Sequence, residues 1–195
     1  MVELRVLQFL HPNLRAGADL ERLFVGIGET LTWYRLLYLD VPVERWFVYF
    51  LGLLDRLKDD AAQELLERLA VPPRVRKRIR EARQHCRDVL FELGRGGRVP
   101  PSRIYGLLHA LDVEQVLLMM AKARSEQARR AISLYLTRLR GVTVAVTGDD
   151  LKALGIPPGP RYKRILAGLL DAKLDGKLAT EEDEFAFAKR AAGRP

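Results

Sequence analysis

Breaks at proline and glycine divide this chain into about ten segments, and in almost every one the apolar residues recur at the three- and four-residue spacing of an α-helix. No segment shows a convincing alternation of apolar and polar residues, which is the pattern of a half-buried strand. The pattern therefore predicts an all-α protein. We expect helices near residues 2–10, 18–39, 43–57, 61–69, 74–93, 102–110, 113–123, 126–140, 149–154, 161–170 and 180–192.

The helix ends carry recognisable cap signals. Asp112 and Ser125 are predicted N-caps, and Thr180 with Asp183 three residues later predicts a capping box. Residues 141–147 form a short β-branched connector that we expect to be extended. We therefore expect a helical body over residues 1–140, with about ten helices in the whole chain, and a small helical tail over residues 141–195.

The size and composition of the chain predict a folded protein that needs no disulfide. Its 195 residues are 48% hydrophobic and 30% charged, and about 70% of the unfolded surface of such a chain is buried on folding. The single cysteine, Cys86, has no partner for an internal disulfide, so we expect a cytoplasmic setting. The longest apolar stretches fall short of the ~20 residues of a membrane span, and we expect no membrane partner.

A net charge of +8 favours a polyanionic partner such as a nucleic acid. The helix expected over residues 74–93 has one apolar stripe, for which we predict burial: Val75, Ile79, Ala82, Cys86, Val89 and Leu93. The rest of its surface is strongly basic, and the residues that we predict to contact phosphate there are Arg74, Arg76, Lys77, Arg80, Arg83 and Arg87. The alternative is an ordinary solvated face.

The segment from Thr147 to Leu170 holds the most specific motif of the chain. A short helix ends at Gly155-Ile156-Pro157-Pro158-Gly159-Pro160, and the next helix begins at once with Arg161, Tyr162, Lys163 and Arg164. Positive charge in the first turn of a helix opposes the macrodipole, whereas a bound phosphate would favour it. The motif predicts a phosphate-binding helix-turn-helix. A rigid corner between two helices explains the glycines and prolines equally well.

No catalytic or metal-binding pattern emerges from the remaining residues. His11, His85 and His109 are scattered, and we find no nucleotide-binding loop or nucleophile motif. Asp149 and Asp150 fit helix caps better than metal ligands. The aromatic group of residues 33–50 fits core packing better than base stacking. We expect no catalytic residue, metal site or cofactor in this chain.

Several stretches resemble one family. TGDDLKALGIPPGPRYKRILAGLLDAKLDGKLATEEDE resembles the C-terminal signature of bacterial tRNA nucleotidyltransferases of the CCA-adding, A-adding and poly(A)-polymerase-like group. RVLQFLHPNL, TWYRLLYLDVPVERWFVYFLGLLD and ISLYLTRLRGV resemble the helical body of the same enzymes. The catalytic head of the family, with its Gly-Ser and Asp-x-Asp motifs, and the nucleotide-selecting neck have no counterpart in this sequence, so we expect a fragment that is inactive alone.

The resemblance implies that the chain holds the acceptor and TΨC arm of tRNA, while a head that uses Mg²⁺ and ATP or CTP adds nucleotides. The tail residues to which it assigns this role are Gly148, Lys152, Gly155, Pro158, Gly159, Pro160, Arg161 and Lys163. We add Tyr162 for its position among the cations, where stacking on a ribose or base and packing within the protein are both open. Two other hypotheses stay open. One is a helical interaction module that docks on a protein, on the head or on a second copy, through Val2, Val6 and Phe9. The other is a non-specific binder of duplex DNA.

Overall fold

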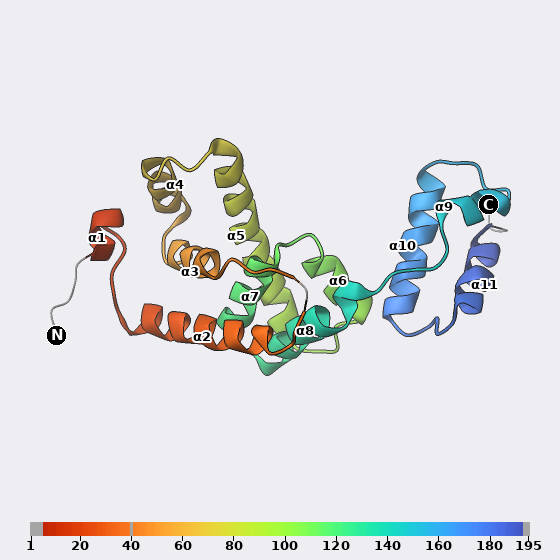
Figure 1. Ribbon diagram of the computed structural model, residues 1–195, viewed down its shortest axis with the longest axis horizontal. Coiled ribbons are helices and arrows are strands. Elements are labelled where there is room, and N and C mark those ends of the chain that lie inside the picture. The colour runs from red at the N-terminus through yellow and green to blue at the C-terminus, as the bar shows by residue number, and fades with distance from the viewer. Residues whose placement is uncertain (1–5, 40, 193–195) are drawn as a thin grey trace. The chain divides into compact units, whose positions relative to one another are not determined.

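A computed structural model of the protein describes residues 6–39 and 41–192 (Figure 1). Within these ranges the chain forms helices, turns and loops but no strand, which confirms the predicted all-α class. The elements are α1 (Val6–Leu10), α2 (Ala18–Arg35), α3 (Arg45–Leu54), α4 (Asp59–Arg68), α5 (Pro73–Gly94), α6 (Pro101–Leu108), α7 (Val113–Lys122), α8 (Glu126–Thr137), the 3₁₀ turn η1 (Leu139–Gly141), α9 (Gly148–Ala153), α10 (Pro160–Leu174) and α11 (Glu181–Ala192).

The predicted helices are present, and most differences lie at their ends. The second helix stops at Arg35 instead of residue 39, because the N–H groups of Leu37 and Tyr38 bond three residues back and Tyr38 turns to φ 51°. The connector before α9 begins at the end of η1 and has extended backbone at Val142 and Thr147, as predicted, without forming a strand. The start of the first predicted helix, residues 2–5, lies outside the described residues.

Each predicted N-cap forms its hydrogen bonds. The Ser125 hydroxyl accepts from the N–H of Ala128 at 3.1 Å, and Gln115 accepts from the N–H of Asp112 at 3.1 Å. Thr180 and Asp183 form a reciprocal capping box at the start of α11, with distances of 3.2 and 3.0 Å. These bonds satisfy helix N–H groups that have no partner inside the helix.

The chain forms two compact units. Unit 1 comprises Met1–Gly96 and Ala110–Ile132, and unit 2 comprises Gly97–His109 and Ser133–Pro195. The sequence placed the division between body and tail at residue 140, whereas unit 2 also takes in α6 and the end of α8. The reason is local: α6 packs on α10, and the N–H of Ser102 donates to the Asp175 carboxylate at 3.0 Å.

Helix α7 is the centre of unit 1, where it packs against α2, α3 and α5. Its own buried residues supply much of this core, among them Val116, Leu117 and Met119. The aromatic residues of α2 and α3 are mainly buried or half-buried, as predicted, but the core prediction is wrong for two of them. Tyr38 is 87% exposed, because it lies beyond the end of α2, and Trp46 in the first turn of α3 is 64% exposed.

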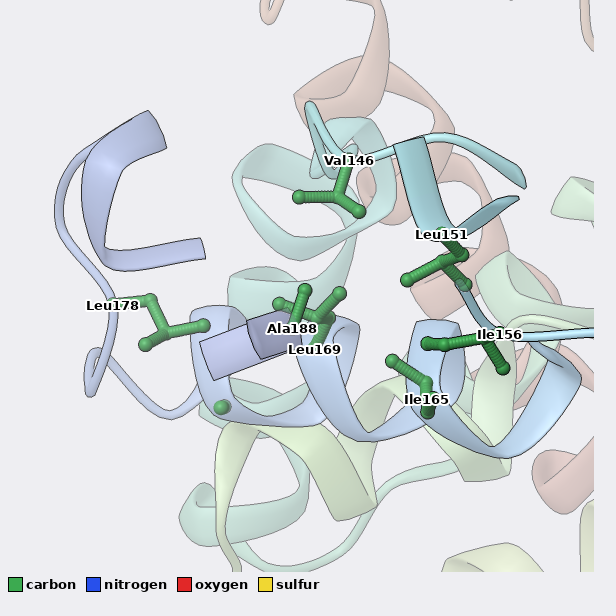
Figure 2. Close-up of a cluster of buried hydrophobic side chains, with 8 residues drawn as sticks. Val146, Leu151, Ile156, Ile165, Leu169, Leu178 and Ala188 are labelled. Atoms are coloured by element: carbon green, nitrogen blue, oxygen red, sulfur yellow. The ribbon is translucent and has the colours of Figure 1, made fainter. Parts of the chain in front are cut away.

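Unit 2 has its own hydrophobic core, built by α9, α10, α11 and the loops beside them (Figure 2). The close-up shows Leu151 of α9, Ile156 of the following turn and Ile165 of α10 directed toward a common interior. The cluster consists of Val146, Leu151, Ile156, Ile165, Leu169, Ala172, Leu178 and Ala188. This core fixes the position of the Gly-Pro motif.

Candidate nucleic-acid interface

The turn after α9 is a Schellman motif. The N–H of Gly155 bonds to the carbonyl of Lys152 at 2.9 Å, and the N–H of Ile156 bonds to the carbonyl of Leu151 at 3.2 Å. Gly155 has φ 78°, a left-handed conformation that glycine adopts without steric cost. Ile156 and Leu151 are both buried in the core of unit 2. The predicted role of Gly155 in ending the helix is therefore confirmed.

Tyr162 closes the other side of this turn. Its hydroxyl donates to the carbonyl of Ile156 at 2.9 Å, and its ring lies 3.7 Å from the point where Gly148 would carry a Cβ. The half-buried ring thus packs against α9, and the hydroxyl is already engaged. Pro158, Gly159 and Pro160 are exposed between the two helices. The turn is a rigid corner that presents the start of α10 to solvent.

Asp150 is a capping residue, as the sequence indicated. Its carboxylate accepts from the hydroxyl and the N–H of Thr147 at 2.6 and 2.7 Å, and the hydrogen bond from the hydroxyl is the main cause of its lowered pKa. Asp149 lies exposed in the same helical turn. Among the described residues, no group of three His, Cys, Asp or Glu side chains could hold a metal ion.

Helices α10 and α11 pack side by side and run antiparallel, as two contacts at opposite ends show (Figure 1). At one end Arg161 of α10 donates to the carbonyl of Ala191 in α11 at 3.1 Å. At the other, Lys173 of α10 pairs with Glu184 of α11 at 2.5 Å. The start of α10 therefore lies beside the end of α11. Arg161 at the start of a helix is explained in part by this carbonyl, since the C-terminal end of a helix attracts cations.

The two adjoining helix ends form a basic surface, which we call the tail basic end: Arg161, Lys163, Arg164, Lys189 and Arg190. Lys163, Arg164 and Lys189 are exposed, and within the described part of the chain none of the three makes a side-chain hydrogen bond or ion pair. Lys152 of α9 is likewise exposed and unpaired among the described residues. These side chains are available to an anion without the loss of an internal contact.

Lys189 and Arg190 are members of the tail basic end that sequence reasoning missed. The signal was present as two adjacent cations in the last turn of α11. That position is ordinary for cations, because it complements the helix dipole, and so it attracted no functional interpretation. Only the antiparallel packing of α10 and α11 brings these residues to the motif.

Helix α5 has the predicted amphipathic form, with two departures at the level of residues. Ile79, Cys86, Val89 and Leu93 are buried and Ala82 is half-buried, but Val75 is 40% exposed. Val75 belongs to the first turn of the helix, where the prediction of burial is wrong. Arg83, by contrast, is buried on the stripe side, with 8% of its surface exposed.

Acidic residues of α4 neutralise one side of α5. Arg83 donates to the carbonyl of Leu57 at 2.6 Å and lies 3.4 Å from Asp59, which also pairs with Arg87 at 3.2 Å. Arg76 pairs with Glu67 of α4 at 2.9 Å. Burial lowers the pKa of Arg83, against the opposing effect of Asp59, and the hydrogen bond from Arg87 is the main cause of the lowered pKa of Asp59. These arginines hold α4 on α5.

The other cations of α5 are less constrained. Arg74 and Arg80 are exposed and make no side-chain contact of this kind within the described residues, and Lys77 has only a weak partner, Glu81, at 3.7 Å. Arg78 pairs with Asp112. The basic residues predicted on α5 belong to unit 1 and those of the tail to unit 2. The two basic surfaces are therefore features of different units.

The sequence of the chain is similar to that of a known enzyme. The chain is 41% identical, over 196 aligned residues, to an A-adding tRNA nucleotidyltransferase of Geobacter sulfurreducens. The chain is a relative of the tRNA nucleotidyltransferases. The match covers 98% of the chain but only 22% of that enzyme, so the chain corresponds to less than a quarter of its length. No family model matches the chain.

Solved structures of nucleotidyltransferases share the fold. The Thermotoga maritima CCA-adding enzyme complexed with tRNA matches 94% of the chain with a TM-score of 0.71 and 20% identity, over 44% of that enzyme. A CCA-adding enzyme with CTP matches 93% of the chain with a TM-score of 0.70 and 21% identity, over 42% of that enzyme. The resemblance stated from the sequence motifs is thus confirmed, and the match extends along nearly the whole chain.

No single helix among the described residues has both the length and the apolar composition needed to cross a membrane.

Proposed function

We propose that this chain is the tRNA-holding part of a tRNA nucleotidyltransferase, and that unit 2 binds the acceptor and TΨC arm through phosphate contacts of the tail basic end. The observation that carries the proposal is the set of exposed, internally unpaired cations at the adjoining ends of α10 and α11. The relationship to enzymes that act on tRNA supports RNA as the polyanion.

The geometry favours recognition of shape and charge. A rigid corner fixes the start of α10, so that Lys163 and Arg164 are held in one place while their side chains stay free. Contacts of this kind position a helical nucleic acid without reading its base sequence. On helix α5, Arg74, Lys77 and Arg80 are the residues that we propose as a secondary contact. We leave out Arg76, Arg83 and Arg87, because they hold α4 on α5.

A salt titration of tRNA binding tests the proposal. Binding should weaken steeply as the salt concentration rises, because the cations release counterions from the phosphates. Lys163→Ala combined with Arg164→Ala should weaken binding about tenfold at low salt. Arg15→Ala combined with Lys58→Ala is the matched control, because it removes the same two charges from exposed positions of unit 1 that lack a side-chain partner within the described residues.

Four outcomes would contradict the proposal. Binding that does not depend on salt, or no binding at low salt, excludes phosphate contacts as the basis. An equal loss in the control variant shows that net charge alone matters and that the tail basic end has no special role. Equal affinity for tRNA and for duplex DNA of the same length supports the non-specific DNA binder instead.

We propose further that nucleotide addition is carried out elsewhere in such an enzyme, with Mg²⁺ and ATP or CTP. No cluster of carboxylates among the described residues suits a metal ion, so no catalytic step is assigned to this chain. Incubation of the chain with tRNA, Mg²⁺ and labelled ATP or CTP should give no labelled tRNA. Incorporation above the level of a no-protein control would overturn this assignment.

A second function, protein docking by unit 1, is favoured by exposed apolar side chains. Leu36 and Tyr38, which follow the end of α2, are 60% and 87% exposed, and Trp46 in the first turn of α3 is 64% exposed. Of the residues that the sequence predicts for docking, Phe9 is 76% exposed, whereas Val2 and the side chain of Val6 lie outside the described residues. Light scattering tests this candidate: a dimer that Trp46→Ser dissociates would support it, and a monomer at high concentration argues against self-association.

A further inference from the structure

A groove lies between α10 and α11, within unit 2. It has a volume of about 660 Å³, is open to solvent, and is lined by Arg161, Arg164, Ile165, Gly168, Phe187, Arg190 and Ala191. Arginines make up its charged lining, and no carboxylate lies among these residues. Its remaining surface is apolar and includes the half-buried ring of Phe187. The groove therefore combines three guanidinium groups with an aromatic ring.

Gly168 lies in the middle of α10 and lines this groove. Glycine inside a helix is less favourable than alanine. The packing of α10 on α11 does not require a glycine at this position. A Cβ at position 168 would meet atoms of the Phe187 ring at 3.7 and 3.8 Å, which is ordinary van der Waals contact. The missing side chain leaves the floor of the groove open beside the ring, as expected where a ligand approaches the backbone closely.

The three arginines differ in the hydrogen bonds that their side chains already make within the protein. Arg161 is bound to the carbonyl of Ala191, and the Nε of Arg190 donates to the carbonyl of Ala186 in its own helix at 3.3 Å. Arg164 is exposed and has no side-chain partner within the described residues. An anion at the rim of the groove can thus bind Arg164 and the terminal nitrogens of Arg190 without breaking either of these two hydrogen bonds.

We propose that this groove binds one unpaired nucleotide of the RNA, with its base over Gly168 against the Phe187 ring and its phosphate between Arg164 and Arg190. The inference rests on the proposed function, in which RNA is the partner of unit 2. Every base offers a flat aromatic face, and stacking on a protein side chain does not depend on base identity. The volume lies in the range of pockets that enclose small ligands.

A nucleotide-binding groove would give unit 2 a preference for RNA with unpaired bases, which phosphate contacts alone do not provide. Bases in a continuous duplex are stacked and paired, so they are not available to the groove. Bases in a loop can leave their stack and insert. The protein should therefore bind an RNA stem-loop more tightly than a blunt RNA duplex with the same number of phosphates.

Two substitutions of Gly168 test the groove with little effect on the fold. Gly168→Met places a long side chain against Phe187 and fills the groove, whereas Gly168→Ala adds only a methyl group that the spacing accommodates. Methionine and alanine both favour helix, so neither change should melt α10. We expect Gly168→Met to lower affinity for the stem-loop about tenfold, to the level of the duplex, and Gly168→Ala, which adds one methyl group at the same place, to lower it by much less.

Phe187→Leu provides an independent variant, because it keeps an apolar side chain and removes the aromatic face. It should weaken stem-loop binding and leave duplex binding unchanged. In NMR titrations of the full chain, the amide signals of Gly168 and Phe187 should shift with the stem-loop and remain in place with the duplex.

The outcomes separate the groove from the wider function. Salt-dependent binding of both RNAs with equal affinity, or an unchanged preference in Gly168→Met, overturns the nucleotide site and leaves the phosphate-binding surface standing. If the wild-type chain binds neither RNA at low salt, the proposed function fails, and the nucleotide site fails with it.

Discussion

Glu184 is the most constrained charged residue of unit 2. It is 1% exposed, and it accepts hydrogen bonds from the N–H of Ala145 at 2.6 Å and from Lys173 at 2.5 Å. Burial alone would raise its pKa, but the hydrogen bonds from Lys173 and Ala145 outweigh this effect and hold the pKa below the ordinary value of 4.5. One carboxylate thus joins α11 to α10 and to the connector before α9.

The lowered pKa of Glu184 predicts how the stability of unit 2 depends on pH. A group with a lower pKa in the folded state stabilises the fold above its unfolded pKa, and the contribution is lost as pH falls through the folded value. Glu184→Gln should therefore reduce the free energy of unfolding by about 1–2 kcal/mol at pH 7, and by less at pH 3. Urea unfolding at both pH values measures the difference; an equal loss at both would show that the charge is unimportant.

The burial of Cys86 leads to a second prediction at the residue scale, for the reactivity of its thiol. Burial in the core side of α5 raises the pKa of its thiol to about 12, so almost no thiolate is present at pH 8. A thiol-specific reagent should label the native protein far more slowly than the protein in denaturant. Native labelling at the rate of a free cysteine would show that α5 separates readily from its neighbours.

At the scale of elements, helix α4 ends with an alanine in a left-handed backbone conformation, which residues with a Cβ disfavour. Ala70 adopts φ 53° at the position where a Schellman motif normally has glycine, and the N–H of Val71 bonds to the carbonyl of Leu66 at 2.9 Å. Ala70→Gly should stabilise the protein by about 1 kcal/mol and raise Tm by about 2–4 °C. Ala167→Gly, the same change at an exposed position inside α10, should lower Tm instead.

The sequence predicts the elements well because their signals are local. Proline, glycine and cap residues fix helix ends through bonds that span three to five residues, as at Ser125, Thr180 and Gly155. Contacts between distant residues are less accessible. Nothing in the amphipathic pattern of α5 indicates that Arg83 is buried against Leu57, because this depends on how α4 packs. The same limit explains why Lys189 and Arg190 were missed.

The candidate site shows a similar division between what was predicted and what was not. The Gly-Pro motif and its cations were evident from the sequence, whereas the groove beside Gly168 requires α11 to lie on α10. Arg161 and Tyr162 have internal partners that no spacing rule reveals. Their part in RNA binding stays a prediction, and the exposed Lys163 and Arg164 become the better residues to test.

For the whole molecule, the number of phosphates contacted is measurable through the salt dependence of binding. The slope of log K against log salt reports how many phosphates the protein neutralises. Lys163→Ala combined with Arg164→Ala should reduce the magnitude of this slope by about one for each side chain that contacts a phosphate. An unchanged slope with lower affinity would indicate that the substitutions act through the fold.

The antiparallel pairing of α10 and α11 also separates charge along unit 2. The first turn of α11 carries Glu181, Glu182, Asp183 and Glu184, and the cations of the tail basic end lie at the opposite end of the same pair. Helix α10 is about 22 Å long, well over the Debye length of about 8 Å at physiological salt, so the two ends do not cancel each other. In the field of a polyanion such a unit experiences a torque. It turns its cations toward the nucleic acid before any contact forms, so that more collisions begin in the orientation that binds.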